Sequence, residues 1–240
     1  MHPRHGKRHT PISAVALTNA DVDHIAGLLT LRERQAFTLY ATPRVLDVLD
    51  GNSAFNVLNR DFVTRRPFSL DRAFEPVDSD GHAIGLRVEP FSVPGKVALF
   101  LEDAGAGANF GTVEEDTVGL AIRDVTTGRG FFYMPGCAAL PDDLQQRIRG
   151  SELLLMDGTT WVNDEMAMSG VGEKTSQRMG HMAIADPGGT LEVCANLAIE
   201  RKVFIHINNT NPILIEGSPE QQRARESGWD IAFDGMEIEL

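Results

Sequence analysis

The chain contains little cysteine, only Cys137 and Cys194 among its 240 residues. They lie far apart in apolar stretches, so the sequence provides neither a disulfide framework nor a Cys-x-x-Cys zinc motif, and both are expected to be core thiols. Basic residues are also scarce: 22 Lys and Arg stand against 34 Asp and Glu, which gives a net charge of -12. Because nucleic-acid surfaces use Lys and Arg to neutralise phosphates, this balance argues against a nucleic-acid partner.

Long apolar runs are missing as well. No stretch approaches the roughly 20 residues that span a bilayer, and the polar, basic residues 1–9 are not followed by the apolar segment of a signal peptide. We therefore expect a cytoplasmic protein without a membrane span, in which His2, His5 and His9 are solvated. With 42% hydrophobic residues, the chain is long enough to bury a sizeable core, and a single domain over residues 1–240 is expected.

Strand-like and helical patterns alternate along the chain. Strands expected before or after a helix cover 12–17, 37–40, 152–156, 202–206 and 229–233. The helices expected beside them cover 24–33, 44–49, 142–148, 191–198 and 219–227. The middle of the chain shows strands in succession, at 84–91, 97–102, 117–123 and 130–134, with a Gly-rich mobile loop at 103–115. This order predicts a layered α/β protein whose sheets are covered by helices.

Aspartate and histidine recur directly after the expected strands. Asp23 and His24 follow the first strand, Asp157 follows 153–156, and His206 follows 203–205. An isolated Asp-His pair at a helix start more often acts as a cap than as a ligand. Its recurrence at three strand ends favours a metal site. Imidazole and carboxylate ligands with open positions suit iron(II), manganese or zinc, and the residues do not select among them.

Several phrases also carry a family resemblance. Asn19-Ala20-Asp21-Val22-Asp23-His24 resembles a degenerate form of the His-x-His-x-Asp-His motif of metallo-β-lactamase-fold hydrolases. Within that superfamily, the chain resembles the pyrroloquinoline quinone (PQQ) biosynthesis protein B family over nearly its whole length. The phrases that carry this resemblance are Asp23-His24-Ile25-Ala26-Gly27-Leu28-Leu29, Asp157-Gly158-Thr159, Gly170-Val171-Gly172, Met179-Gly180-His181 and His206-Ile207-Asn208-Asn209-Thr210-Asn211-Pro212.

The resemblance implies an α/β fold of four layers, an αββα sandwich with the metal site at one edge. Relatives begin with a Gly-rich strand and a cysteine-rich zinc-binding segment, whereas Met1-His2-Pro3-Arg4-His5-Gly6 resembles interior sequence of the family. We therefore expect an N-terminally incomplete fold. A sheet edge exposed in this way favours aggregation or pairing into a homodimer.

The resemblance also implies roles for individual residues. The second metal of the superfamily maps onto Asp23, His24, Asp157 and His206. The first-metal positions here hold Asn19, Asp21 and Lys96, so that site is expected to be lost, and Asn19 and Asp21 are left to contact substrate or a weakly held ion through water. His181 matches the catalytic histidine of some superfamily phosphodiesterases, which implies an acid-base or substrate role first and a ligand role second. Lys96, Lys174 and Arg178 are expected to meet substrate carboxylates, the alternative being a solvated surface.

The family implies a step in making PQQ from the Glu and Tyr of a precursor peptide, alongside other PQQ biosynthesis proteins. Two roles are attached to it: moving the quinone or its precursor toward the periplasm, and oxidising the Tyr-derived ring with iron(II) and oxygen. Since one Asp/His site can hold oxygen beside a phenol, we favour hydroxylation of the ring of a dipeptide-like precursor. A zinc hydrolase of the superfamily and a non-catalytic carrier are the alternatives.

Overall fold

The computed structural model describes residues 10–240, so His2, His5 and His9 lie outside the described residues. The chain groups into two compact units. In the described part, the first comprises residues 10–92, 97–118 and 123–127, and the second comprises residues 93–96, 119–122 and 128–240. Each unit is described by itself below. The expected single domain stays a prediction.

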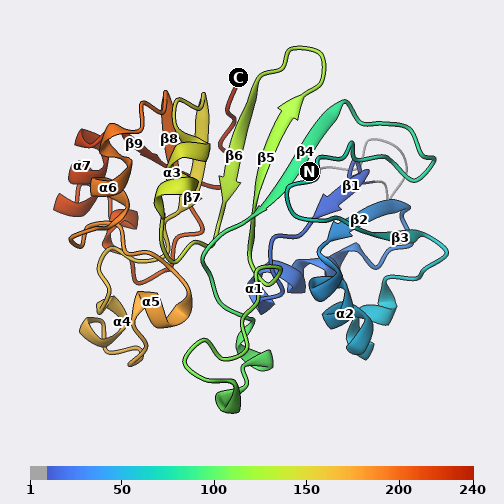
Figure 1. Cartoon of the computed structure of the whole chain (residues 1–240), viewed down its shortest axis with the longest axis horizontal. Helices are drawn as coiled ribbons and strands as arrows, with labels where there is room; N and C mark the ends of the chain where they lie inside the picture. Colours follow the sequence, from blue (N-terminus) through green and yellow to red (C-terminus); the bar gives the residue numbers. More distant parts are fainter. Residues whose placement is uncertain (1–9) are drawn as a thin grey trace. The chain divides into compact units, whose positions relative to one another are not determined.

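A parallel three-stranded sheet lies at the centre of the first unit (Figure 1), with β1 (Ala14–Ala16), β2 (Phe37–Ala41) and β3 (Val63–Pro67) in that order. All five residues of β2 are buried, as expected for a parallel strand with neighbours on both sides. Thr42 begins the following helix, α2 (Pro43–Gly51), because its side chain accepts the Val45 N–H. The strand expected at 37–40 and the helix expected at 44–49 are thereby confirmed. The strand β3 was not predicted from the sequence.

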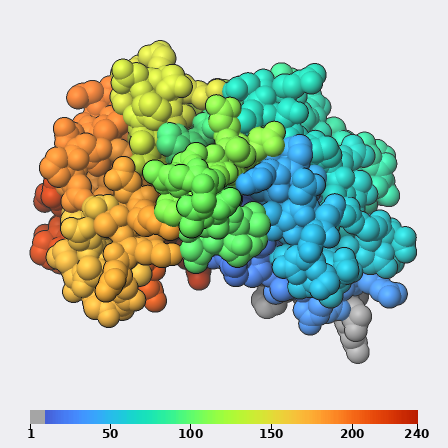
Figure 2. Space-filling view, turned by 60° about the horizontal axis from the view of Figure 1, so that its bottom comes forward, coloured from blue at the N-terminus to red at the C-terminus, as the bar shows by residue number. Residues whose placement is uncertain are grey.

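Between β1 and β2 the chain forms a helical segment that consists of α1 (Val22–Ile25) and the 3-10 helix η1 (Ala26–Leu31). The first unit also contains η2 (Ser53–Val57), β4 (Leu86–Ser92), η3 (Leu99–Leu101) and η4 (Ala104–Ala106). The strand expected at 97–102 was wrong. There the Val97 N–H donates to the Thr112 side chain and the Leu101 N–H donates to Ala98, so the backbone closes a turn instead of pairing with a strand. Figure 2 shows residues near 100 to 115, in green, at the surface.

Parallel strands form most of the sheet in the second unit. Its sheet has the order β5 (Val118–Asp124, which contributes Gly119–Ile122), β6 (Gly130–Met134), β7 (Leu153–Asp157), β8 (Arg201–Ile205) and β9 (Trp229–Ile231). The pairs from β6 to β9 are parallel (Figure 1), and Asp157 pairs in register with Ile205. The residues that follow β7 and β8 therefore leave the sheet at the same edge.

Short helices connect the strands of the second unit. They are α3 (Asp142–Ile148), α4 (Glu165–Met168), α5 (Ser176–Met179), α6 (Thr190–Val193), η5 (Cys194–Asn196), η6 (Pro212–Leu214) and α7 (Pro219–Glu226). The helices expected at 142–148 and 219–227 are confirmed, the one at 191–198 divides into α6 and η5, and α4 and α5 were not predicted. Across residues 10–240, every helix is too short or too polar to cross a membrane.

The two cysteines are buried thiols, as the sequence predicts. Burial raises the pKa of Cys194 to about 12. Burial, with the negative charge of Asp157 as a second cause, also raises the pKa of Cys137. Because the thiolate is the nucleophile, neither thiol should react with a disulfide reagent at about pH 8 in the folded protein. We expect both thiols to react once denaturant is added, and rapid labelling of the native chain would contradict this assignment.

Candidate metal centre

Asp157, at the end of β7, is fully buried and surrounded by hydrogen-bond donors. Its Oδ1 accepts the Thr159 N–H at 3.0 Å and the Thr159 hydroxyl at 2.6 Å. Its Oδ2 accepts the Cys137 N–H at 3.0 Å and lies 2.7 Å from His181 Nδ1. Burial alone would raise the pKa of Asp157, but the neighbouring His181 and the hydrogen bonds from His181 and Thr159 hold it well below its usual range. The carboxylate is therefore ionised at neutral pH.

Thr159 lies at the centre of the same group. Besides Asp157, its Oγ1 lies 2.9 Å from His206 Nδ1 and 3.1 Å from His181 Nδ1. The two imidazole rings are stacked, with centroids 5.3 Å apart. One hydroxyl group thus contacts the carboxylate and both histidines.

His206 follows β8 directly and has a left-handed backbone, with φ of 52°. This conformation costs a residue other than glycine on the order of 1–3 kcal/mol. It turns the chain sharply at the strand end, where the His206 carbonyl lies 3.1 Å from Thr159 Oγ1. The residues that follow are fixed by their amides: the Asn208 N–H donates to Thr159 O, and Asn211 Nδ2 donates to Gly158 O at 2.9 Å. The Asn-rich phrase therefore holds the loop that carries His206.

Asp157, His181 and His206 each present a ligand atom, and these atoms lie within 4.8 Å of one another. Two imidazoles and a carboxylate are donors suited to a divalent transition metal, and the buried, polar setting fits such an ion. The hydrogen bonds to Asp157 already occupy both of its oxygens. The structure therefore offers the two imidazoles more readily than the carboxylate.

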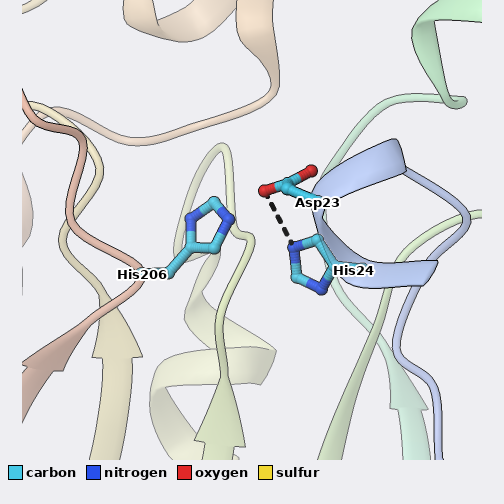
Figure 3. Close-up of side chains that lie close together, drawn as sticks. All are labelled: Asp23, His24 and His206. Atoms are coloured by element: carbon cyan, nitrogen blue, oxygen red, sulfur yellow. Dashed lines mark ion pairs between the residues drawn. The ribbon is translucent and has the colours of Figure 1, made fainter. Parts of the chain in front are cut away.

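The Asp23–His24 pair belongs to the first unit, at the start of α1. His24 Nε2 lies 3.9 Å from Asp23 Oδ2 (Figure 3), and His24 Nδ1 lies 3.5 Å from Thr18 Oγ1. Asn19 is buried and its Oδ1 accepts the Asp21 N–H at 3.0 Å, which shapes the turn before α1. Asp23 and His24 are thus presented together from one short turn, as the sequence predicts.

The other predicted site residues lie in the second unit. Lys96 packs against Gly180, one residue before His181: a Cβ at Gly180 would lie 2.8 Å from Lys96 Cγ. Lys174 is exposed just before α5, and Arg178 is half-buried within that helix. The structure therefore brings Lys96 next to the His181 segment, and the substrate roles of Lys96, Lys174 and Arg178 stay predictions.

Comparisons with known proteins identify the fold. A family model described as a beta-lactamase superfamily domain matches residues 1–207. The coenzyme PQQ synthesis protein B of Gluconacetobacter diazotrophicus is 50% identical over 240 residues, which cover 99% of this chain and 76% of that protein. The crystal structure of zinc-bound PqqB from Methylobacterium extorquens matches with a TM-score of 0.92 and 49% identity, covering 100% of this chain and 77% of that one.

A more distant solved structure shares the fold alone. It is a diphosphatase of the PhnP family, with a TM-score of 0.59 and 17% identity, and the match covers 95% of this chain and 72% of that one. Together, the family model and the zinc-bound neighbour confirm the expected α/β fold of the metallo-β-lactamase type.

Proposed function

Because the chain belongs to the coenzyme PQQ synthesis protein B family, within the beta-lactamase superfamily, we propose that it acts in PQQ biosynthesis as an iron(II)- and oxygen-dependent hydroxylase. Its substrate is the tyrosine ring of a dipeptide-like precursor derived from Glu and Tyr, which other proteins of the pathway deliver and process further. The observation that carries this proposal is the cluster of Asp157, His181 and His206, which places a proposed ligand, His206, beside a supporting carboxylate and a proposed proton acceptor, His181.

The proposed ligands are Asp23, His24 and His206, assigned by resemblance to the superfamily motif, with Asp157 completing or supporting the shell. Iron(II), when bound, supplies the redox chemistry that lets oxygen react with a phenol ring. Asp23 and His24 are adjacent on one turn (Figure 3), and His206 directly follows β8 with a left-handed backbone; both observations support this assignment.

His181 is the proposed acceptor of the phenolic proton. An ionised carboxylate only accepts hydrogen bonds, so the 2.7 Å contact with Asp157 requires the proton on His181 Nδ1. The neutral ring then has its lone pair on Nε2, which is the atom that can take a proton. Carboxylates of the precursor are assigned to Lys96, Lys174 and Arg178, and Asn19 and Asp21 are kept as substrate contacts.

The reaction replaces a ring C–H bond by C–OH. One oxygen atom of O₂ enters the ring and the other leaves as water, so two electrons must come from a reductant such as ascorbate. Zinc is the second candidate metal, because the PqqB relative was crystallised with Zn²⁺. Zinc has no redox chemistry, so a zinc-dependent chain would be a hydrolase or a carrier instead.

Metal content after anaerobic reconstitution with iron(II) tests the site. We expect about one iron per wild-type chain and a loss of most of it in His206→Ala, because the ring is a proposed ligand. Asp230→Asn is the control, since this side chain lies on β9, is 50% exposed and contacts Arg201, and it should keep the wild-type content. Equal iron in all three proteins would contradict the assignment.

Turnover tests the reaction. The iron-loaded chain, with ascorbate and a Glu–Tyr crosslinked or dipeptide substrate, should give a product heavier by one oxygen, and labelled O₂ should supply that atom. Absence of this product with iron, together with ester or phosphodiester hydrolysis with zinc, would favour the hydrolase instead.

A further inference from the structure

The hydroxyl of Thr159 can donate only one hydrogen bond. Its shortest contact, 2.6 Å, is to Asp157 Oδ1, and a bond to an ionised carboxylate is the strongest one available to it. The Thr159 proton is therefore directed to Asp157, which leaves the lone pairs of Oγ1 to accept from a neighbour.

The neighbour that fits is His206. Its Nδ1 lies 2.9 Å from Thr159 Oγ1, whereas it lies 3.8 Å from Asp157 Oδ1, beyond hydrogen-bond distance. Since the hydroxyl proton is already directed to Asp157, the contact is satisfied only if His206 Nδ1 carries a proton. His206 thus reaches the carboxylate through Thr159, while His181 reaches it directly.

We propose that Thr159 is a positioning residue that sets the tautomer and orientation of His206, so that Nε2 is the nitrogen offered to the metal. Histidine ligands are commonly fixed in this way, by a hydrogen bond from the other ring nitrogen. Here the Thr159 hydroxyl donates to Asp157 and accepts from His206, so it links the two side chains. His181 contacts the same carboxylate directly. This inference deepens the proposed metal site and rests on the proposed function for the use of that metal.

Two neighbouring features support a fixed position for Thr159. Its backbone is held at both sides, because its N–H donates to Asp157 Oδ1 and its carbonyl accepts the Asn208 N–H at 3.1 Å. It is also 6% exposed, so water does not compete readily for these contacts.

The first test uses Thr159→Val, which removes the hydroxyl at nearly constant shape, and Thr159→Ser, which keeps it. Affinity for cobalt(II) or zinc(II) is measured with a competing chelator. Loss of an outer hydrogen-bond partner typically weakens metal binding about 10- to 100-fold. We expect that loss for Thr159→Val, and an affinity within about threefold of wild type for Thr159→Ser. Unchanged affinity in Thr159→Val, or an equal loss in Thr159→Ser, would overturn the proposal.

The second test needs neither metal nor turnover. Nitrogen-15 NMR of histidine in the metal-free wild type, assigned with His206→Asn, should show His206 with its proton on Nδ1. In Thr159→Val this signal should change, while that of His181 should keep the Nδ1–H form. A wild-type His206 protonated on Nε2 would overturn the proposal, even if Thr159→Val failed to fold. If both tests succeed but hydroxylation is not seen, the proposed reaction fails and the positioning role stands.

Discussion

Asp157→Asn should weaken metal binding about 100-fold, because it removes the one negative charge in the cluster and the acceptor that orients His181. The substituted amide also brings an NH₂ group into a position where the native oxygens face the Cys137 N–H and the Thr159 N–H. A buried donor opposed by another donor is left unsatisfied, so the free energy of unfolding should fall by about 2–4 kcal/mol.

Metal titration and urea unfolding of the metal-free protein measure the two effects separately. Asp230→Asn is the matched control: this aspartate lies on β9, is half exposed, and contacts Arg201 at 2.9 Å. It should bind metal like the wild type and change the free energy of unfolding by no more than about 1 kcal/mol. An Asp157→Asn protein that binds metal normally would show that the cluster is not the metal site.

The same carboxylate predicts how stability depends on acid. Although burial opposes its charge, its neighbours lower the pKa of Asp157 below the unfolded value of about 3.9. A lowered folded pKa means that the stabilising contribution is fully present above about pH 4 and is lost as the pH falls further, toward the folded pKa. The free energy of unfolding of the metal-free wild type, measured with urea, should therefore fall below about pH 4. In Asp157→Asn this free energy should fall less steeply with pH. Parallel declines in the two proteins would contradict this source.

Much of this site was predictable because residues that follow neighbouring parallel strands lie at the same edge of a sheet. Asp157 and His206 follow two apolar runs, and parallel pairing of β7 with β8 places those two strand ends at one edge. Residue type and position alone therefore identified both side chains. The role of His181 was assigned by resemblance alone, and the structure places this residue after the single-turn helix α5, for which the apolar pattern gives no signal.

Thr159 was not predicted to have any role, although it lies two residues after Asp157. Its importance depends on the left-handed turn at His206 and on the contacts that His181 and His206 make with its hydroxyl group. Apolar periodicity carries no information on either feature. The wrong strand at 97–102 has a similar origin. Val97 and the following apolar residues have strand-like composition, but the Thr112 hydroxyl competes for the backbone donor.

Gly189→Ala should be among the most destabilising single substitutions in the second unit. A Cβ at this position would lie 2.5 Å from Ala183 O, 2.7 Å from Asp186 O and 2.9 Å from Ile184 O. Its own backbone, with φ of -77°, suits any residue, so the penalty is steric rather than conformational. These oxygens accept the N–H groups of residues 189–191, and none of them can withdraw without breaking a hydrogen bond.

We expect Gly189→Ala to lower the free energy of unfolding by about 3 kcal/mol, the upper part of the range for an overpacked site. Gly27→Ala is the control, since a Cβ there would meet nothing within 4 Å, and it should stay within about 0.5 kcal/mol of wild type. The loop that Gly189 closes also donates the N–H of Ile184 to Thr160 O and that of Ala185 to Trp161 O. Because these acceptors directly follow Thr159, metal affinity should fall together with stability in Gly189→Ala. A stable variant that binds metal like the wild type would show that this loop does not hold the site in place.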